Sequence, residues 1–258
     1  GQDEGLKAKI GNKPVIEIKA TVDGKVMSWK NGDTPVSISI DYVPTEEELK
    51  NPDSIVVWYI DGNGKASSVP TGKYDPASGK VTFTTTHFST YAVAYNFKTF
   101  KDAGKYQWAQ KPIQAMAAKG ILDGTSDTVF SPDANITRAE FMDALVKALG
   151  LSCEFDANFS DVKTTDAYYE SVGIAKKLGI TGGTGKNRFS PGAQITRQEM
   201  AVFTARALKL ARIDSVAGQA SDLKKFTDAS GIASYAVGSM ATLVKEGILS
   251  GNNNRINP

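Results

Sequence analysis

The chain has 258 residues, of which 41% are hydrophobic and 22% are charged. This composition is typical of globular proteins, and the length predicts about two domains. Lys and Arg total 30 against 28 Asp and Glu, so the net charge is only +2 and gives no reason to expect a nucleic-acid partner. No apolar run is long enough to cross a bilayer, so we expect no membrane insertion. The first residues lack the features of a signal peptide, as if the chain were cut from a longer one.

Metal-binding and catalytic residue patterns are absent from the sequence. The single cysteine, Cys153, cannot form an internal disulfide. The single histidine, His87, excludes His-rich metal sites, argues against a Ser-His-Asp triad, and is expected to pack near a strand end. No spacing of Asp and Glu suggests the paired carboxylates of a glycoside hydrolase. We therefore predict no catalytic residue, no metal and no cofactor, and hence no enzyme activity in this chain.

The N-terminal part of the chain has the alternating pattern of β-strands. Apolar and polar residues alternate from Val15 and again over 36–42, and Ile55–Ile60 is a continuous apolar run, as in a strand that is covered on both faces. Further strands are expected at 81–86 and 91–95. Turn sequences such as Asp23-Gly24 separate these runs. The pattern predicts an antiparallel, immunoglobulin-like β-sandwich over residues 1–97, with the role of a spacer.

Two groups of side chains in this part have a structural and a chemical interpretation. The acidic residues Glu46–Glu48 are interpreted as a solvated face rather than a metal or acid–base site, in a helical turn that Thr45 opens. The aromatic residues could form a platform for a sugar ring, although core packing explains them as well. This second group comprises Trp58, Tyr59, Tyr74 and Tyr91.

Residues 100–258 contain the same motif three times. The copies begin at Phe100, Phe159 and Phe226, and a second apolar landmark follows thirty positions later in each copy, at Phe130, Phe189 and Ile256. Such a period indicates one supersecondary unit that is used several times. Because one unit cannot bury its own apolar face, the copies must pack on one another.

Each copy is predicted to form a helix, a loop and, in the first two copies, a second helix. The first helix ends in a glycine, which accepts the left-handed backbone at a helix end. The loop contains a second glycine. The second helix opens with the sequence Thr-x-x-Glu, which predicts a capping box in which side chain and backbone bond reciprocally. The capping residues are Thr137 with Glu140 and Thr196 with Glu199.

Arg138 and Arg197 follow the capping threonines at the first helical position, where the helix dipole opposes a cation. One interpretation is that these arginines serve an anion, because a guanidinium can clamp a carboxylate next to the free N–H groups of the helix. The other is that each arginine pairs with an Asp or Glu of a neighbouring repeat. The local pattern leaves both open.

The ordered motifs, F-x-D, a helix ending in GI, a glycine loop, F-x-P and ITRAE, resemble the S-layer homology family. The segment GKVTFTTTHFSTYAVAY also resembles the small β domain that often precedes such repeats in Gram-positive surface proteins. The resemblance implies repeats at 98–158, 159–225 and 226–258, arranged as an α-helical pseudo-trimer with grooves between the repeats. It also implies a secreted, cell-surface protein that is held non-covalently to a pyruvylated secondary cell wall polysaccharide. By this resemblance Arg138 and Arg197 would bind the pyruvate carboxylate, and the facing wall would comprise Gly124, Gly183, Ser250 and Gly251.

The chain departs from this family pattern in two places. The second motif reads TRQE instead of TRAE, which keeps both the arginine and the capping box. The third copy ends at Pro258, whereas its arginine would fall at position 264, since Arg138 lies six positions after Pro132. We therefore expect an apolar slot where the third core helix is missing, closed by self-association or by a segment from outside the chain. The slot is expected to be bordered by Phe141, Leu145, Phe203, Leu208, Met240 and Leu243.

Two other functions remain open from the sequence. The chain could be a structural subunit of a self-assembling surface layer. It could also belong to a polysaccharide-degrading enzyme whose catalytic domain lies outside this sequence.

Overall fold

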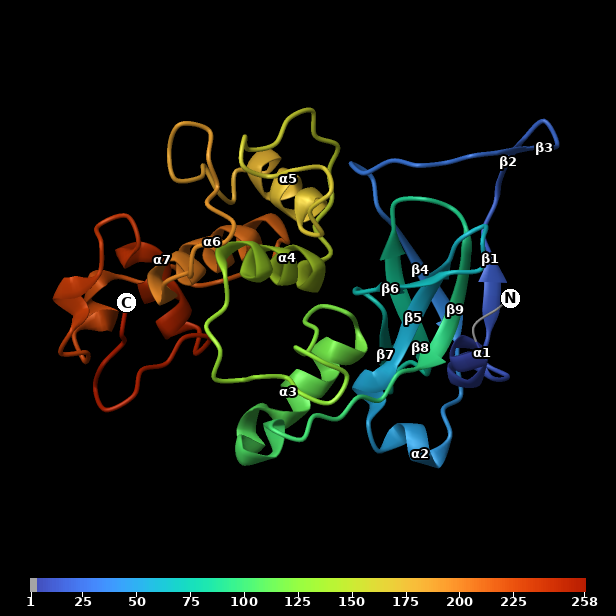
Figure 1. The fold of residues 1–258 in the computed structure, drawn as a ribbon, viewed down its shortest axis with the longest axis horizontal. Coiled ribbons are helices and arrows are strands. Elements are labelled where there is room, and N and C mark those ends of the chain that lie inside the picture. Colours follow the sequence, from blue (N-terminus) through green and yellow to red (C-terminus); the bar gives the residue numbers. More distant parts are fainter. Residues whose placement is uncertain (1–3) are drawn as a thin grey trace. The chain divides into compact units, whose positions relative to one another are not determined.

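The computed structural model describes residues 4–258, and Figure 1 shows the ribbon. The chain divides into two units. Unit 1 contains the residues up to Ala134 together with Ser152–Glu154, and unit 2 contains Asn135–Leu151 and Phe155–Pro258. The division falls inside the first repeat, so that the first and second helices of that repeat belong to different units.

The strands of unit 1 form three antiparallel sheets. A four-stranded sheet has the order β1-β9-β5-β6, a three-stranded sheet has the order β4-β8-β7, and β2 pairs with β3 alone. The bounds are β1 Val15–Glu17, β2 Ala20–Val22, β3 Lys25–Met27, β4 Val36–Asp41, β5 Ile55–Ile60, β6 Ala66–Val69, β7 Lys73–Asp75, β8 Lys80–Thr85 and β9 Thr90–Tyr95. Antiparallel sheets followed by a helical region with the repeats confirm the predicted fold class.

Both faces of the four-stranded sheet are covered. On one face, Val57 and Val93 pack in a common core with Val81 and Phe83 of the three-stranded sheet. On the other face, Val56, Trp58 and Ala94 pack with Ala118 and with two residues of helix α1 (Glu4–Ile10), Leu6 and Ile10. This double coverage explains the continuous apolar sequence of β5 and confirms its interpretation as a strand covered on both faces.

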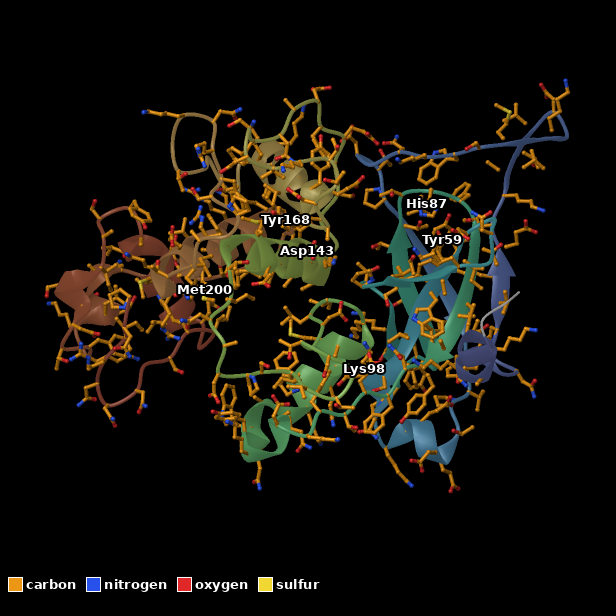
Figure 2. The ribbon with its side chains drawn as sticks, in the orientation of Figure 1. Tyr59, His87, Lys98, Asp143, Tyr168 and Met200 are labelled. Carbon is orange, nitrogen blue, oxygen red and sulfur yellow. The ribbon has the colours of Figure 1, made fainter. Side chains whose placement is uncertain are left out.

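The four aromatic residues that could have formed a sugar platform pack in or against the hydrophobic core. Trp58 is 8% exposed and Tyr91 is 1% exposed, and Tyr59 and Tyr74 pack against the core between the sheets. His87 is half-buried beside the Tyr91 hydroxyl, which lies 3.3 Å from Nδ1, and burial lowers the pKa of the imidazole. Figure 2 shows His87 and Tyr59 together at one end of the strands. The four side chains therefore do not form one common exposed platform for a sugar.

The interpretation of the acidic cluster as a solvated face is wrong for Glu48. Thr45 caps the short helix α2 (Glu46–Leu49), as expected, but Glu48 is only 4% exposed. Its carboxylate accepts hydrogen bonds from the Tyr42 hydroxyl (2.9 Å) and the Thr45 N–H (2.8 Å) and lies 3.1 Å from Lys13 Nζ. Burial raises the pKa of this carboxyl, but these partners lower it more, so the net pKa is below its usual range.

The first helix of the first repeat packs against the strand region of unit 1. A short 3-10 turn, η2 (Ala103–Lys105), leads into helix α3 (Gln107–Ala118). The Asn96 side-chain amide donates to the Ala118 carbonyl at 2.8 Å. Directly after the helix, Gly120 lies so close to Ser68 that an added Cβ would come within 2.8 Å of the serine side chain.

The described α-helices of unit 2 are α4 (Arg138–Leu149), α5 (Tyr169–Lys177), α6 (Arg197–Leu210) and α7 (Val237–Lys245). Unit 2 also contains the 3-10 turns η3 (Ala220–Leu223) and η4 (Ala229–Gly231), and unit 1 contains the 3-10 turn η1 (Pro52–Ser54). Thr137 and Thr196 form the predicted capping boxes of α4 and α6. The glycines after α3, α5 and α7 have the predicted left-handed backbone, with φ of 65° at Gly120, 74° at Gly179 and 71° at Gly247.

Three of the six side chains that were expected to border an open apolar slot are buried. Phe203, Met240 and Leu243 are 6%, 0% and 3% exposed, and Phe141, Leu145 and Leu208 are half-buried. The reason is that α7 packs against α6 and η3 packs against α7, which places Met240 and Leu243 in one cluster with Ala201 and Val202 of α6. In Figure 1, α6 and α7 lie side by side. An open apolar slot is therefore contradicted at these three positions, whereas self-association or closure by an outside segment stays a prediction.

Candidate functional site

An aspartate closes the loop of every repeat. The carboxylate of Asp161 accepts hydrogen bonds from the N–H groups of Phe189 (2.8 Å) and Ser190 (2.9 Å). Burial raises the pKa of this carboxyl, but the two N–H groups outweigh burial and hold the pKa below its usual range. Asp102 and Asp228 make the same pair of bonds in the other repeats, to Phe130 and Ser131 and to Ile256 and Asn257.

The second residue of each of these pairs has a left-handed backbone. The φ angles are 62° at Ser131, 59° at Ser190 and 52° at Asn257. A non-glycine residue needs compensation there, and the charge-assisted bond from its N–H to the aspartate provides it. The aspartate thus explains the F-x-D motif, whose role the sequence did not reveal.

The loop glycines are required by the packing of the aromatic residue that opens each repeat. A Cβ added at Gly183 would lie 2.6 Å from the Phe159 ring and 2.3 Å from the Arg188 carbonyl oxygen. The corresponding ring distances are 2.7 Å for Gly124 with Phe100 and 2.5 Å for Gly251 with Phe226. The absent side chain therefore has a structural cause inside the repeat, and a ligand role for these glycines stays a prediction.

Arg138 is buried between the first two repeats, within unit 2. It is 4% exposed, its Nε donates to the Phe189 carbonyl at 3.0 Å, and Nη1 donates to Glu199 Oε1. The guanidinium carbon lies 5.1 Å from the Phe189 ring centre and 5.4 Å from that of Phe203, within the range of cation–π attraction. This geometry matches the second interpretation of the arginines, a pair with an acidic residue of the neighbouring repeat.

Glu199 has two roles, because its two oxygens have different partners. Oε2 accepts from the Thr196 N–H at 3.0 Å and completes the capping box of α6, while Oε1 binds Arg138 of α4. The backbone adds to the same junction, since the N–H groups of Arg138 and Ala139 donate to the carbonyls of Ala193 and Pro191. The capping residue of one repeat thus also fixes the helix start of the repeat before it.

Arg197 occupies the same place in the second repeat, but its guanidinium is exposed. Nε donates to the Ile256 carbonyl at 3.0 Å, which repeats the bond from Arg138 to Phe189, and Nη2 donates to the Ser250 carbonyl at 2.9 Å. Among residues 4–258, no carboxylate forms an ion pair with Arg197.

Two groups of predicted site residues are formed within unit 2, and Gly183 of the same unit belongs to neither. Arg197, Ser250 and Gly251 lie together, since Arg197 binds the Ser250 carbonyl and Gly251 is the next residue. Arg138 and Glu199 form a closed ion pair. In Figure 2, Asp143 marks the position of α4 and Met200 that of α6. Gly124 belongs to unit 1.

Residues 4–258 contain neither a metal-binding group of side chains nor a membrane-spanning helix. No group of His, Cys, Asp and Glu in this range could hold a metal ion. Within the same range, every helix is too short or too polar to cross a membrane.

Residues 99–142, 158–201 and 225–258 match the S-layer homology domain. Domains of this kind anchor proteins to the cell wall. The three matched ranges each contain the aromatic-Asp pair and the loop glycine described above, and the first two also contain the capping box with its arginine.

The chain is similar to several curated proteins. It is 31% identical over 231 residues to an amylopullulanase of Thermoanaerobacterium thermosulfurigenes, a match that covers 89% of this chain and 12% of the relative. It is 35% identical to exoglucanase XynX of Acetivibrio thermocellus (59% of this chain, 14% of the relative). It is 31% identical to the surface-layer 125 kDa protein of Lysinibacillus sphaericus (56% and 12%). The chain thus spans about an eighth of the length of these relatives, and the surface-layer relatives indicate a cell-surface location.

Proposed function

Since the chain is an S-layer homology protein, with three such domains between residues 99 and 258, we propose that it anchors a secreted protein of a Gram-positive cell by binding a pyruvylated secondary cell wall polysaccharide. The binding group is Arg197, and the ligand group is the carboxylate of the pyruvate ketal. The pyruvate and the type of polymer come from the resemblance to the family. The choice of residue rests on the geometry of unit 2.

The observation that supports this choice is the open guanidinium of Arg197. An arginine has five N–H donors, and the bonds to the Ile256 and Ser250 carbonyls use two of them. Three donors stay available, at the N-terminus of a helix of 14 residues, where the helix dipole also favours an anion. The two carbonyl bonds hold the guanidinium in place, so little side-chain entropy is lost when a carboxylate binds.

Arg138 is a weaker candidate for the same role. Its guanidinium is buried and already binds a carboxylate, that of Glu199. A ligand would have to break this pair before it could bind. We therefore propose that Arg138 holds the first two repeats together and that polysaccharide binding depends on Arg197.

The variant Arg197→Ala is expected to weaken binding to purified Gram-positive cell walls by roughly 10- to 150-fold, because a lost charge-assisted contact costs about 1.5–3 kcal/mol. The melting temperature is expected to stay close to that of the unchanged chain. Binding is measured by co-sedimentation over a range of wall concentrations.

The matched control for this experiment is Arg206→Ala. Arg206 lies on the same helix and donates to one backbone carbonyl, that of Ile180 at 2.9 Å, so it tests the loss of an arginine without the loss of the proposed site. Its affinity should stay within about twofold of the unchanged chain. Equal affinities of the Arg197→Ala variant and the unchanged chain would disprove the assignment of the site.

A second candidate function is a structural subunit of a surface layer. It is favoured by the similarity to the surface-layer 125 kDa protein of Lysinibacillus sphaericus and to S-layer protein sap of Bacillus anthracis. Electron microscopy of the concentrated chain distinguishes the two, since a subunit gives ordered arrays and an anchor does not. The similarity to an amylopullulanase and an exoglucanase supports a third arrangement, in which the anchored protein is a polysaccharide-degrading enzyme.

A further inference from the structure

Unit 1 contains a basic pocket that the wall-binding residues do not explain. It has a volume of about 510 Å³ and lies on the face of the four-stranded sheet that α1 covers. We call it the lysine pocket, and its defining residues are Lys9, Trp58, Lys65, Ser68, Asn96 and Lys98. Figure 2 shows Lys98 on the segment that leads from the strands toward α3.

Asn96 holds one of the lysines in place. This asparagine is 5% exposed, and its side-chain amide is fixed by the bond to the Ala118 carbonyl. Its Oδ1 accepts from Lys9 Nζ at 2.9 Å, and the same ammonium lies 5.7 Å from the ring centre of Trp58. An ammonium has three donors, so Lys9 keeps donors for a ligand while its position is set by a buried amide.

The positive charge of the lysine pocket is only partly balanced by carboxylates of the protein. No Asp or Glu lines it. Lys98 is 3.6 Å from Asp123, a carboxylate whose side chain is 77% exposed, and among residues 4–258 Lys65 has no ion-pair partner. Three lysines thus line the pocket, and only Lys98 is paired with a carboxylate, in a chain whose total net charge is only +2.

We propose that the lysine pocket binds an anionic saccharide that carries phosphate groups. The volume lies within the usual range for small-molecule sites. Lysine acts on phosphate as a point charge, whereas a single carboxylate is better matched by the planar fork of arginine, which this pocket lacks. Ser68 and Trp58, which both line the pocket, supply a polar group and an apolar surface for the sugar. The strand region would then be a second glycan-binding module and not only a spacer.

The site is tested by titrating the full chain with glucose 6-phosphate as the probe, using isothermal calorimetry at low salt. We expect saturable binding that weakens when the salt concentration rises, whereas glucose alone should not bind. Lys65→Gln and Lys98→Gln should each weaken binding by at least about threefold, the size of one screened surface charge contact. Both lysines are replaceable without loss of a buried bond, so the variants are expected to fold.

The control variant is Lys25→Gln, because Lys25 lies on β3, is exposed and does not line the pocket. It should bind the probe like the unchanged chain. In proton–nitrogen spectra, the probe should shift the signals of Gly64, Ser68 and the Trp58 indole. Equal loss of affinity in Lys25→Gln, or no binding of the probe, would overturn the proposal. Inorganic phosphate that binds as tightly as glucose 6-phosphate would overturn the saccharide assignment.

The proposal is independent of the wall-binding site. Arg197→Ala should leave the binding of glucose 6-phosphate unchanged, since Arg197 belongs to unit 2 and the lysine pocket to unit 1. A change in probe affinity in that variant would contradict the assignment of the probe to the lysine pocket.

Discussion

Arg138→Ala is expected to lower the free energy of unfolding of unit 2 by about 2–4 kcal/mol. Removing one partner of a buried ion pair leaves the other charge without compensation, at a cost of about 3–5 kcal/mol for a fully buried pair. The cost is expected to lie somewhat below the top of that range because the Glu199 side chain is 26% exposed, compared with 5% for Arg138. The variant also loses the bond to the Phe189 carbonyl and the contact with two aromatic rings.

Urea unfolding followed by circular dichroism at the helix band measures this effect. The three tryptophans, Trp29, Trp58 and Trp108, all belong to unit 1. Tryptophan fluorescence therefore reports unit 1 separately, and its transition is expected to change less than the helical signal. A signal that shifts equally for both probes would show that the ion pair acts beyond unit 2.

The control for Arg138→Ala is the same substitution at the corresponding position of the second repeat. Arg197 is exposed and bonds only to backbone carbonyls, so Arg197→Ala should cost less than about 1 kcal/mol. The two variants thus separate a stabilising arginine from a ligand-binding one. Equal destabilisation by both would mean that Arg197 is also structural, and the proposed binding role would lose its support.

Gly183→Ala is expected to destabilise the chain by about 2–4 kcal/mol. Its φ is 77°, which costs an alanine about 1 kcal/mol. The new Cβ would also meet the Arg188 carbonyl oxygen at 2.3 Å and the Phe159 ring at 2.6 Å, so the loop or the ring must move, at a cost typical of overpacking. Thermal unfolding of the full chain measures the loss.

Gly182, the residue before Gly183, provides the control for the Gly183→Ala variant. An added Cβ at Gly182 would meet no atom within 4 Å, and its φ is not in the left-handed region. Gly182→Ala should therefore be neutral or slightly stabilising, because alanine restricts the unfolded chain. If the two alanine variants unfold at the same temperature, the loop does not depend on the close approach of Phe159.

Features that depend on neighbouring residues were predictable from the sequence. The capping boxes of α4 and α6, the left-handed glycines after α3, α5 and α7 and the apolar strand β5 all follow from short-range rules. The strands β6 and β7 were not predicted, because Ala66–Val69 and Lys73–Asp75 are short and lack a clear alternation. Helix α1 was missed because its seven residues span only about two turns, too few to show a clear helical period.

The state of each arginine depends on a distant partner, which local rules do not provide. Arg138 and Arg197 stand in nearly identical sequences, TRAE and TRQE, yet one is buried and the other exposed. The difference arises 61 residues away, where Glu199 reaches Arg138. The same limit applies to the role of Asp161, whose bonds to Phe189 and Ser190 span 28 and 29 residues.

Co-sedimentation of the 258-residue chain with purified Gram-positive cell walls, before and after the secondary polymer is chemically stripped, decides whether this polymer is the ligand. The chain is expected to sediment with intact walls, to lose this binding on stripped peptidoglycan, and to be displaced from the walls by free polymer. Undiminished binding to stripped peptidoglycan would disprove binding through the polymer, because the ligand would then be the peptidoglycan itself.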